Sequence, residues 1–179
     1  MAYFTAVITR SGSAWKARDV EVDEHSSLDD LADALRGVAI GNAPVLAVVE
    51  HEDEWFAVIR VDGDDEPRLF VSDLYAASRS SYGDLLAPAA DVLDDGSGDD
   101  DEDDEGDEDT DDEDAAGGGS EPVEITVDAW AGETDLLEDL GVSGKTLRHL
   151  VEEHADDPGY VLGEVGEAVG FAELLEALR

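Results

Sequence analysis

An acidic run from Asp94 to Asp114 is the feature that most constrains what this chain can fold into. It holds 16 acidic side chains, no basic one, and no aliphatic or aromatic residue. Such a run cannot bury apolar surface to offset the entropy lost on ordering, and its charges repel one another. A Gly-rich stretch, residues 115–120, follows it. The sequence therefore predicts a disordered linker over residues 93–121, between an ordered segment at 1–92 and another at 122–179.

The overall charge narrows the choice of partners. The chain has 10 Lys and Arg residues against 49 Asp and Glu, a formal net charge of -39. This charge repels phosphate backbones and anionic membrane surfaces, so we expect no direct binding to nucleic acid or to a membrane. Basic protein surfaces are the natural partners. The alternative is that the acidity serves solubility, or adaptation to salt.

The chain lacks the residues that several other classes need. It contains no cysteine, which excludes disulfides, thiolate catalysis and Cys-ligated zinc. Residues 1–7 have no basic n-region and are typical of a strand rather than a signal peptide. No stretch approaches the roughly 18 consecutive apolar residues of a membrane helix. Together these features predict a cytoplasmic protein.

Residues 1–92 have an α+β pattern with a small antiparallel sheet. Ser27 and Asp30 have the spacing of a helix cap, and apolar residues recur at helical intervals after them. We expect this helix to end at Gly41, and a second helix to cover 75–86. Strands are expected over 3–9, 15–22, 45–49, 55–61 and 68–71.

Residues 122–179 have an all-helical pattern. Glycines and an Asp-Pro-Gly turn separate its apolar stretches. About 55 residues is a marginal size for a core of its own, so packing against a partner or against the first segment remains open. Helices are expected over 133–140, 143–154, 161–169 and 171–178.

Two motifs resemble known ligand sites but depart from them. Residues 141–146, Gly-Val-Ser-Gly-Lys-Thr, look like the end of a phosphate-binding loop, yet Asp139 occupies the position of the required first glycine. We expect Ser143 to cap a helix and Lys145 to be exposed. Residues 101–112 approach a calcium loop but lack its bidentate glutamate and flanking helices. The four histidines lack the spacing of a metal-binding pair, so no catalytic, cofactor or metal site is predicted, and no cofactor.

The three tryptophans are the largest side chains available as anchors. Trp15 and Trp55 lie at the starts of expected strands and are typical of core residues. Trp130 follows the linker in a weakly patterned stretch that is harder to assign to a core. It is therefore our candidate for contact with a partner protein.

Several blocks of the sequence, taken together, resemble those of a known protein family. They are the opening MAYFTAV, LDDLADALRGVA at 28–39, EDEWFAVIRVDGD at 52–64, EPRLFVSD at 66–73, ASRSSYGDLL at 77–86, and a tail from DLLEDLGVS at 135–143 to GEAVGF at 166–171. The chain resembles the bacterial tRNA adenosine deaminase-associated proteins over both ordered segments. The resemblance implies association with the enzyme that makes inosine at the tRNA wobble position, and supplies no functional residue. The chain is not that deaminase, whose zinc site needs H-x-E and P-C-x-x-C.

These observations favour a non-enzymatic accessory protein that binds the deaminase or its tRNA complex. A nucleic-acid mimic, whose acidic linker competes for a basic protein surface, is one alternative. An enzyme with an unrecognised site is the other.

Overall fold

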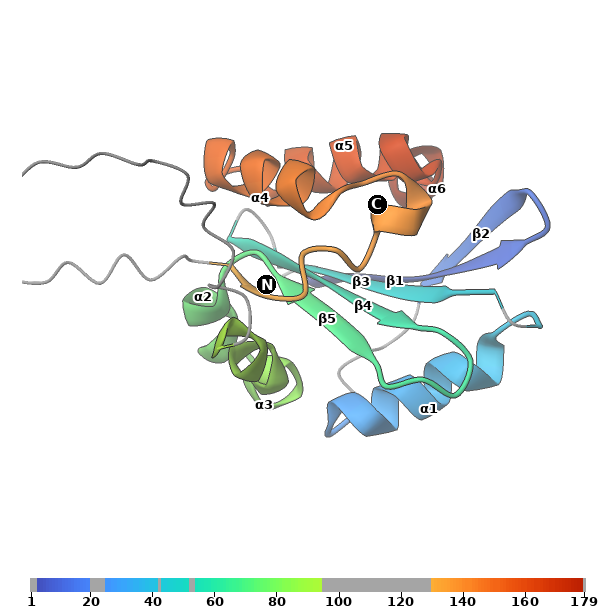
Figure 1. Cartoon of the computed structure of the whole chain (residues 1–179), viewed down its shortest axis with the longest axis horizontal. Coiled ribbons are helices and arrows are strands. Elements are labelled where there is room, and N and C mark those ends of the chain that lie inside the picture. The colour runs from blue at the N-terminus through green and yellow to red at the C-terminus, as the bar shows by residue number, and fades with distance from the viewer. Residues whose placement is uncertain (1–2, 20–24, 42, 52–53, 95–129, 179) are drawn as a thin grey trace, which may run out of the picture.

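A central antiparallel sheet lies between two layers of helices (Figure 1). This computed structural model describes residues 3–19, 25–41, 43–51, 54–94 and 130–178. Within these residues the sheet has six strands, in the order β2-β1-β3-β4-β5-β6. The strands are β1 (Tyr3–Ser11), β2 (Ala14–Asp19), β3 (Val45–His51), β4 (Trp55–Val61), β5 (Arg68–Val71) and β6 (Ala131–Gly132).

The two middle strands are apolar along almost their whole length because helices cover both faces of the sheet. Successive side chains of a strand point to opposite faces. Val45, Ala47 and Val49 of β3 therefore belong to one core, while Leu46 and Val48 belong to the other. A run of this kind needs two apolar layers, and each segment of the chain supplies one.

The first layer comes from residues before the acidic run. Helix α1 (Leu28–Val38) begins as expected, with the Ser27 side chain accepting a hydrogen bond from the Asp30 backbone N–H. It is followed by α2 (Leu74–Ser78), α3 (Gly83–Leu86) and the 3-10 helix η2 (Ala87–Asp94). The single helix expected over 75–86 was wrong. Ser80 interrupts it, because its hydroxyl donates to the Ala77 carbonyl and accepts from the Tyr82 N–H, which favours a turn.

The second layer comes from the C-terminal segment. It consists of α4 (Gly144–Glu153), α5 (Pro158–Val169) and α6 (Ala172–Leu178), which cover the opposite face of the sheet (Figure 1). Leu147, Val161 and Phe171 pack in one core with Ile8 and Phe70 of the strands. The sequence left open whether these helices pack against a partner or against the first segment. In the structure they pack against the first segment. Strand β6 also joins that segment's sheet, beside β5.

The expected fold class, an antiparallel sheet with helices followed by C-terminal helices, is confirmed. The helix expected over 133–140 was wrong: only a 3-10 turn, η3 (Glu138–Leu140), forms there.

The expected linker overlaps η2 at Leu93 and Asp94. The rest of the linker, like residues 20–22 of the expected second strand, lies outside the described residues. The boundaries 1–92 and 122–179 stay a prediction. In the described part of the chain, no helix is both long and apolar enough to span a membrane.

Candidate protein-docking surface

Trp130 is held between the sheet and helix α4. Its ring stacks on that of Phe70 in β5, with centroids 6.2 Å apart and 23° between the planes. The guanidinium carbon of Arg148 in α4 lies 6.0 Å from the Trp130 ring centroid. The side chain is partly buried, and its Nε1 has no hydrogen-bond partner among the described residues. Trp130 is thus more firmly packed than its sequence context indicated, because its stacking partner Phe70 is distant in the sequence.

Gly132 brings Trp130 to this position. In β6 it pairs with Phe70 and has a φ of 96°, which side chains rarely adopt. A Cβ on Gly132 would lie 2.1 Å from the carbonyl oxygen of Leu69. The next N–H, of Glu133, donates to that same carbonyl at 2.8 Å. Only glycine allows the chain to approach β5 this closely.

Arg68 fixes the residues that follow β6. Its Nε donates to the Glu133 carboxylate at 2.6 Å, and its Nη2 donates to the Asp135 carboxylate at 2.7 Å. Arg68 pairs in register with Arg60 on the neighbouring strand β4. Two like charges placed side by side on a sheet repel each other, so both require carboxylates nearby.

Arg60 holds the turn before α4 and is buried against it. It donates to both carboxylate oxygens of Asp62 and of Asp139, and to the backbone carbonyl of Leu136 at 2.6 Å. The hydrogen bonds from Arg60 lower the pKa of Asp139 against the opposing effect of desolvation. The hydrogen bond with Asp139 in turn raises the pKa of Arg60. These contacts join β4 to the C-terminal segment and set where α4 begins.

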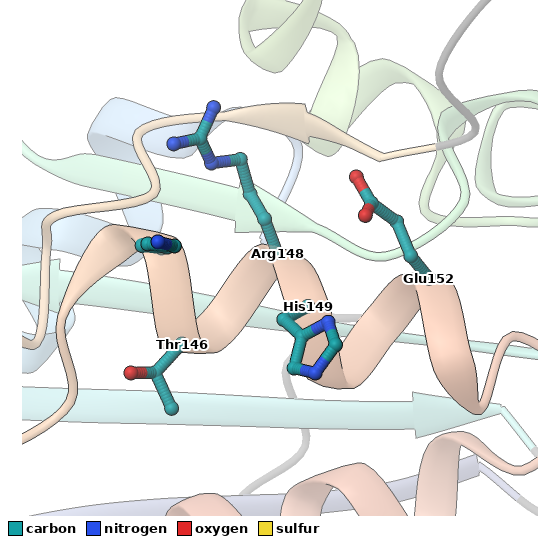
Figure 2. Close-up of a pocket in the computed structure, with 5 residues that line it drawn as sticks. Thr146, Arg148, His149 and Glu152 are labelled. Carbon is teal, nitrogen blue, oxygen red and sulfur yellow. The ribbon is translucent and has the colours of Figure 1, made fainter.

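Helix α4 presents exposed polar side chains around a recess of about 440 Å³. The Ser143 hydroxyl accepts from the Thr146 N–H at 3.2 Å, so the helix begins at the expected cap. Figure 2 shows Arg148 and Glu152 projecting from the same side of α4. The residues lining the recess are Lys145, Thr146, Arg148, His149 and Glu152. We call Trp130 with these five residues the α4 surface.

The α4 surface carries positive charge on a strongly acidic chain. Lys145 and Arg148 are exposed and have no acidic partner within the described ranges. The Nε2 atom of His149, which lines the recess, lies 3.2 Å from a carboxylate oxygen of Glu153, which does not line it. By contrast, Arg36, Arg60 and Arg68 are all paired with carboxylates. Two cations, an aromatic ring and a recess are therefore available to a ligand here.

The other residues singled out in the sequence have structural positions. Trp55 is fully buried, and Trp15 donates from Nε1 to the Val169 carbonyl at 3.0 Å while its ring meets Phe171 edge-on. Lys145 is exposed as expected, and a 3-10 turn rather than a buried strand precedes residues 141–146. The calcium-like window, 101–112, lies outside the described residues. Among those that are described, no group of three or more His, Asp or Glu side chains could hold a metal ion.

The fold and the surface describe a small α+β protein in which both segments contribute to one sheet and its cores. Residues 3–172 match the family model described as Rv3753c-like tRNA adenosine deaminase-associated protein. The chain belongs to this family, as its sequence blocks indicated. Neither the curated proteins nor the solved structures provide a match.

Proposed function

We propose that this chain is a non-catalytic accessory protein that binds tRNA adenosine deaminase, alone or with its tRNA, through the α4 surface. Membership of the deaminase-associated family is the observation that carries this proposal. The α4 surface supports it, because it combines a fixed aromatic side chain with exposed cations and a recess. Aromatic and arginine side chains are the usual anchors of protein interfaces.

The acidic run and the folded surface have different roles in this proposal. Charges beyond about 8 Å are screened at physiological salt, so each acid of the run adds little to the final affinity. Their summed field still raises the rate of encounter with a basic surface. The α4 surface, which loses water on binding, determines how long the complex lasts.

The alternative is an acidic mimic of nucleic acid. The observation that favours it is the run from Asp94 to Asp114, which has 16 acids and no base. In that case the run itself is the ligand, and the folded part only carries it.

Size-exclusion chromatography of the purified chain with purified deaminase, with and without tRNA, tests the proposal. We expect co-elution in both cases, and retention of the complex when residues 99–114 are replaced by an uncharged Gly-Ser segment of equal length. Failure to co-elute both with and without tRNA would refute the accessory role. Loss of the complex with the Gly-Ser variant, at low and high salt alike, would favour the mimic.

A parallel assay addresses catalysis. We expect the chain alone to leave adenosine in tRNA unchanged, and the untagged protein to contain no stoichiometric zinc. Inosine formation by the chain alone would overturn the non-catalytic assignment.

A further inference from the structure

The α4 surface has the opposite charge to the chain as a whole. We propose that it receives an acidic peptide segment of the partner protein, with one carboxylate bound between Lys145 and Arg148. This inference rests on the proposed function and names the chemistry that the α4 surface selects.

The positions of the two cations fit a carboxylate. Lys145 and Arg148 are three residues apart in α4, so their side chains emerge from neighbouring points on one face of the helix. Arg148 is oriented by the ring of Trp130. An arginine held over an aromatic ring loses less side-chain freedom when it binds an acid. The recess beside them, about 440 Å³, has room for the residues next to that acid.

Such a site would let the chain discriminate among the basic proteins that its charge attracts. A net charge of -39 attracts many basic proteins with little discrimination. A uniformly basic surface, however, would be repelled at Lys145 and Arg148. Only a partner that presents an acid at the matching place meets favourable charges at both the acidic run and α4. Repulsion of the wrong partner combined with attraction of the right one is a common basis of specificity.

A peptide suits this surface better than an RNA backbone. Every nucleotide adds a negative charge, and successive phosphates would lie against a strongly acidic molecule. Glu152 also lines the recess and would repel a phosphate chain passing along it. A peptide segment brings one or two carboxylates together with neutral backbone and apolar side chains.

The chain offers an unusually clean chemical test, because its only lysines are Lys145 and Lys16. A water-soluble carbodiimide joins a lysine amine to a carboxylate that it already touches, forming an amide. We would treat the purified complex of full-length chain and deaminase with carbodiimide and map the products by mass spectrometry. The inference predicts a bond from Lys145 to an Asp or Glu of the deaminase. Lys16, exposed on β2, is the matched control and should form none.

Two variants separate charge from chemistry. Lys145→Arg keeps the charge, so it should retain binding while losing the cross-link. The double variant K145E/R148E should raise the dissociation constant at least about tenfold, as expected for reversing a close charge pair. Circular dichroism should show both variants folded, since both side chains are exposed.

The other outcomes would each overturn the inference. One is a complex in which Lys145 stays unlinked, or bonds only to acids of its own chain. Another is tight binding by K145E/R148E. A third is an ultraviolet cross-link from α4 to tRNA that the double variant abolishes, which would make RNA the ligand. In these cases the accessory role stands, because the complex still forms. Absence of any complex with the deaminase would remove both proposals.

Discussion

Gly132 is the residue on which the geometry of the docking surface most depends. Its φ of 96° and its closeness to the Leu69 carbonyl both exclude a side chain. We predict that Gly132→Ala lowers the free energy of unfolding by about 2 kcal/mol or more, because a positive φ alone costs about 1–2 kcal/mol for other residues. Urea denaturation at equilibrium measures the change.

Gly163 in α5 is the matched control for this substitution. A Cβ there would meet nothing within 4 Å, and the residue lies within a helix. Gly163→Ala should therefore raise stability, by about 0.5–1 kcal/mol. Equal destabilisation by the two substitutions would contradict the importance given to the β5–β6 contact.

Asp139 provides the prediction that depends on pH. Hydrogen bonds from Arg60 lower its pKa in the folded protein below the ordinary value of 3.8. A carboxyl group of this kind stabilises the fold above its unfolded pKa, and that contribution is lost as pH falls through the folded pKa. Asp139→Asn should cost about 1 kcal/mol at pH 7, a value reduced because the side chain is 59% exposed. The cost should be smaller at pH 3, which lies below the unfolded pKa.

Denaturation curves at the two pH values measure this difference. Glu138→Gln is the control, because Glu138 is exposed and has no ion pair in the described part of the structure. A cost for Asp139→Asn that does not change between pH 7 and pH 3 would mean that its charge contributes nothing.

Local signals at single residues were readable from the sequence. Ser27 and Ser143 cap helices as expected, because a cap depends on neighbours three residues away. The pairing of Arg60 with Asp139 could not be read, since it joins residues 79 apart in the sequence. The sequence did place an arginine, Arg60, within the apolar strand 55–61. A buried arginine needs a partner, but this does not identify which residue the partner is.

At the scale of elements, strongly apolar patterns were reliable, whereas two weaker helical patterns were not. The strands 45–49 and 55–61 and the helix opened by Ser27 all form, because their patterns extend over several residues. The expected helices over 75–86 and 133–140 do not form as single helices. In both, tertiary or side-chain hydrogen bonds outweigh a weak helical preference: Ser80 in the first, Arg60 and Arg68 in the second.

The hairpin β1–β2 packs against the C-terminal helices, and Trp15 adds a side-chain hydrogen bond to this contact. Trp15 of β2 donates to Val169 at the end of α5 and contacts Phe171. Trp15→Phe removes the hydrogen bond and leaves the carbonyl without this donor, at a cost of about 1 kcal/mol. We predict faster amide hydrogen exchange in residues 14–19 with little change in β3 and β4. Tyr75→Phe, at a side chain 73% exposed, is the control and should leave exchange in β2 unchanged. Uniform acceleration across all strands would instead indicate global destabilisation.

At the scale of the whole molecule, the two segments complete each other. The first supplies most of the sheet and one helical layer, while the second supplies the opposite layer, β6 and the acids that neutralise Arg68. The sequence indicated that the second segment is of marginal size for a stable hydrophobic core of its own. It did not show the face on which that segment packs, because this depends on contacts between residues that are far apart in the chain.

Binding kinetics with the deaminase test the central claim most directly, namely that the folded α4 surface determines binding and the acidic run only speeds it. Stopped-flow measurements at low and physiological salt would compare K145E/R148E with the variant carrying a neutral segment at 99–114. The account predicts that the double variant mainly accelerates dissociation. It also predicts that the neutral segment slows association at low salt and leaves dissociation nearly unchanged. The opposite pattern, with dissociation controlled by the acidic run and insensitive to α4, would contradict the account.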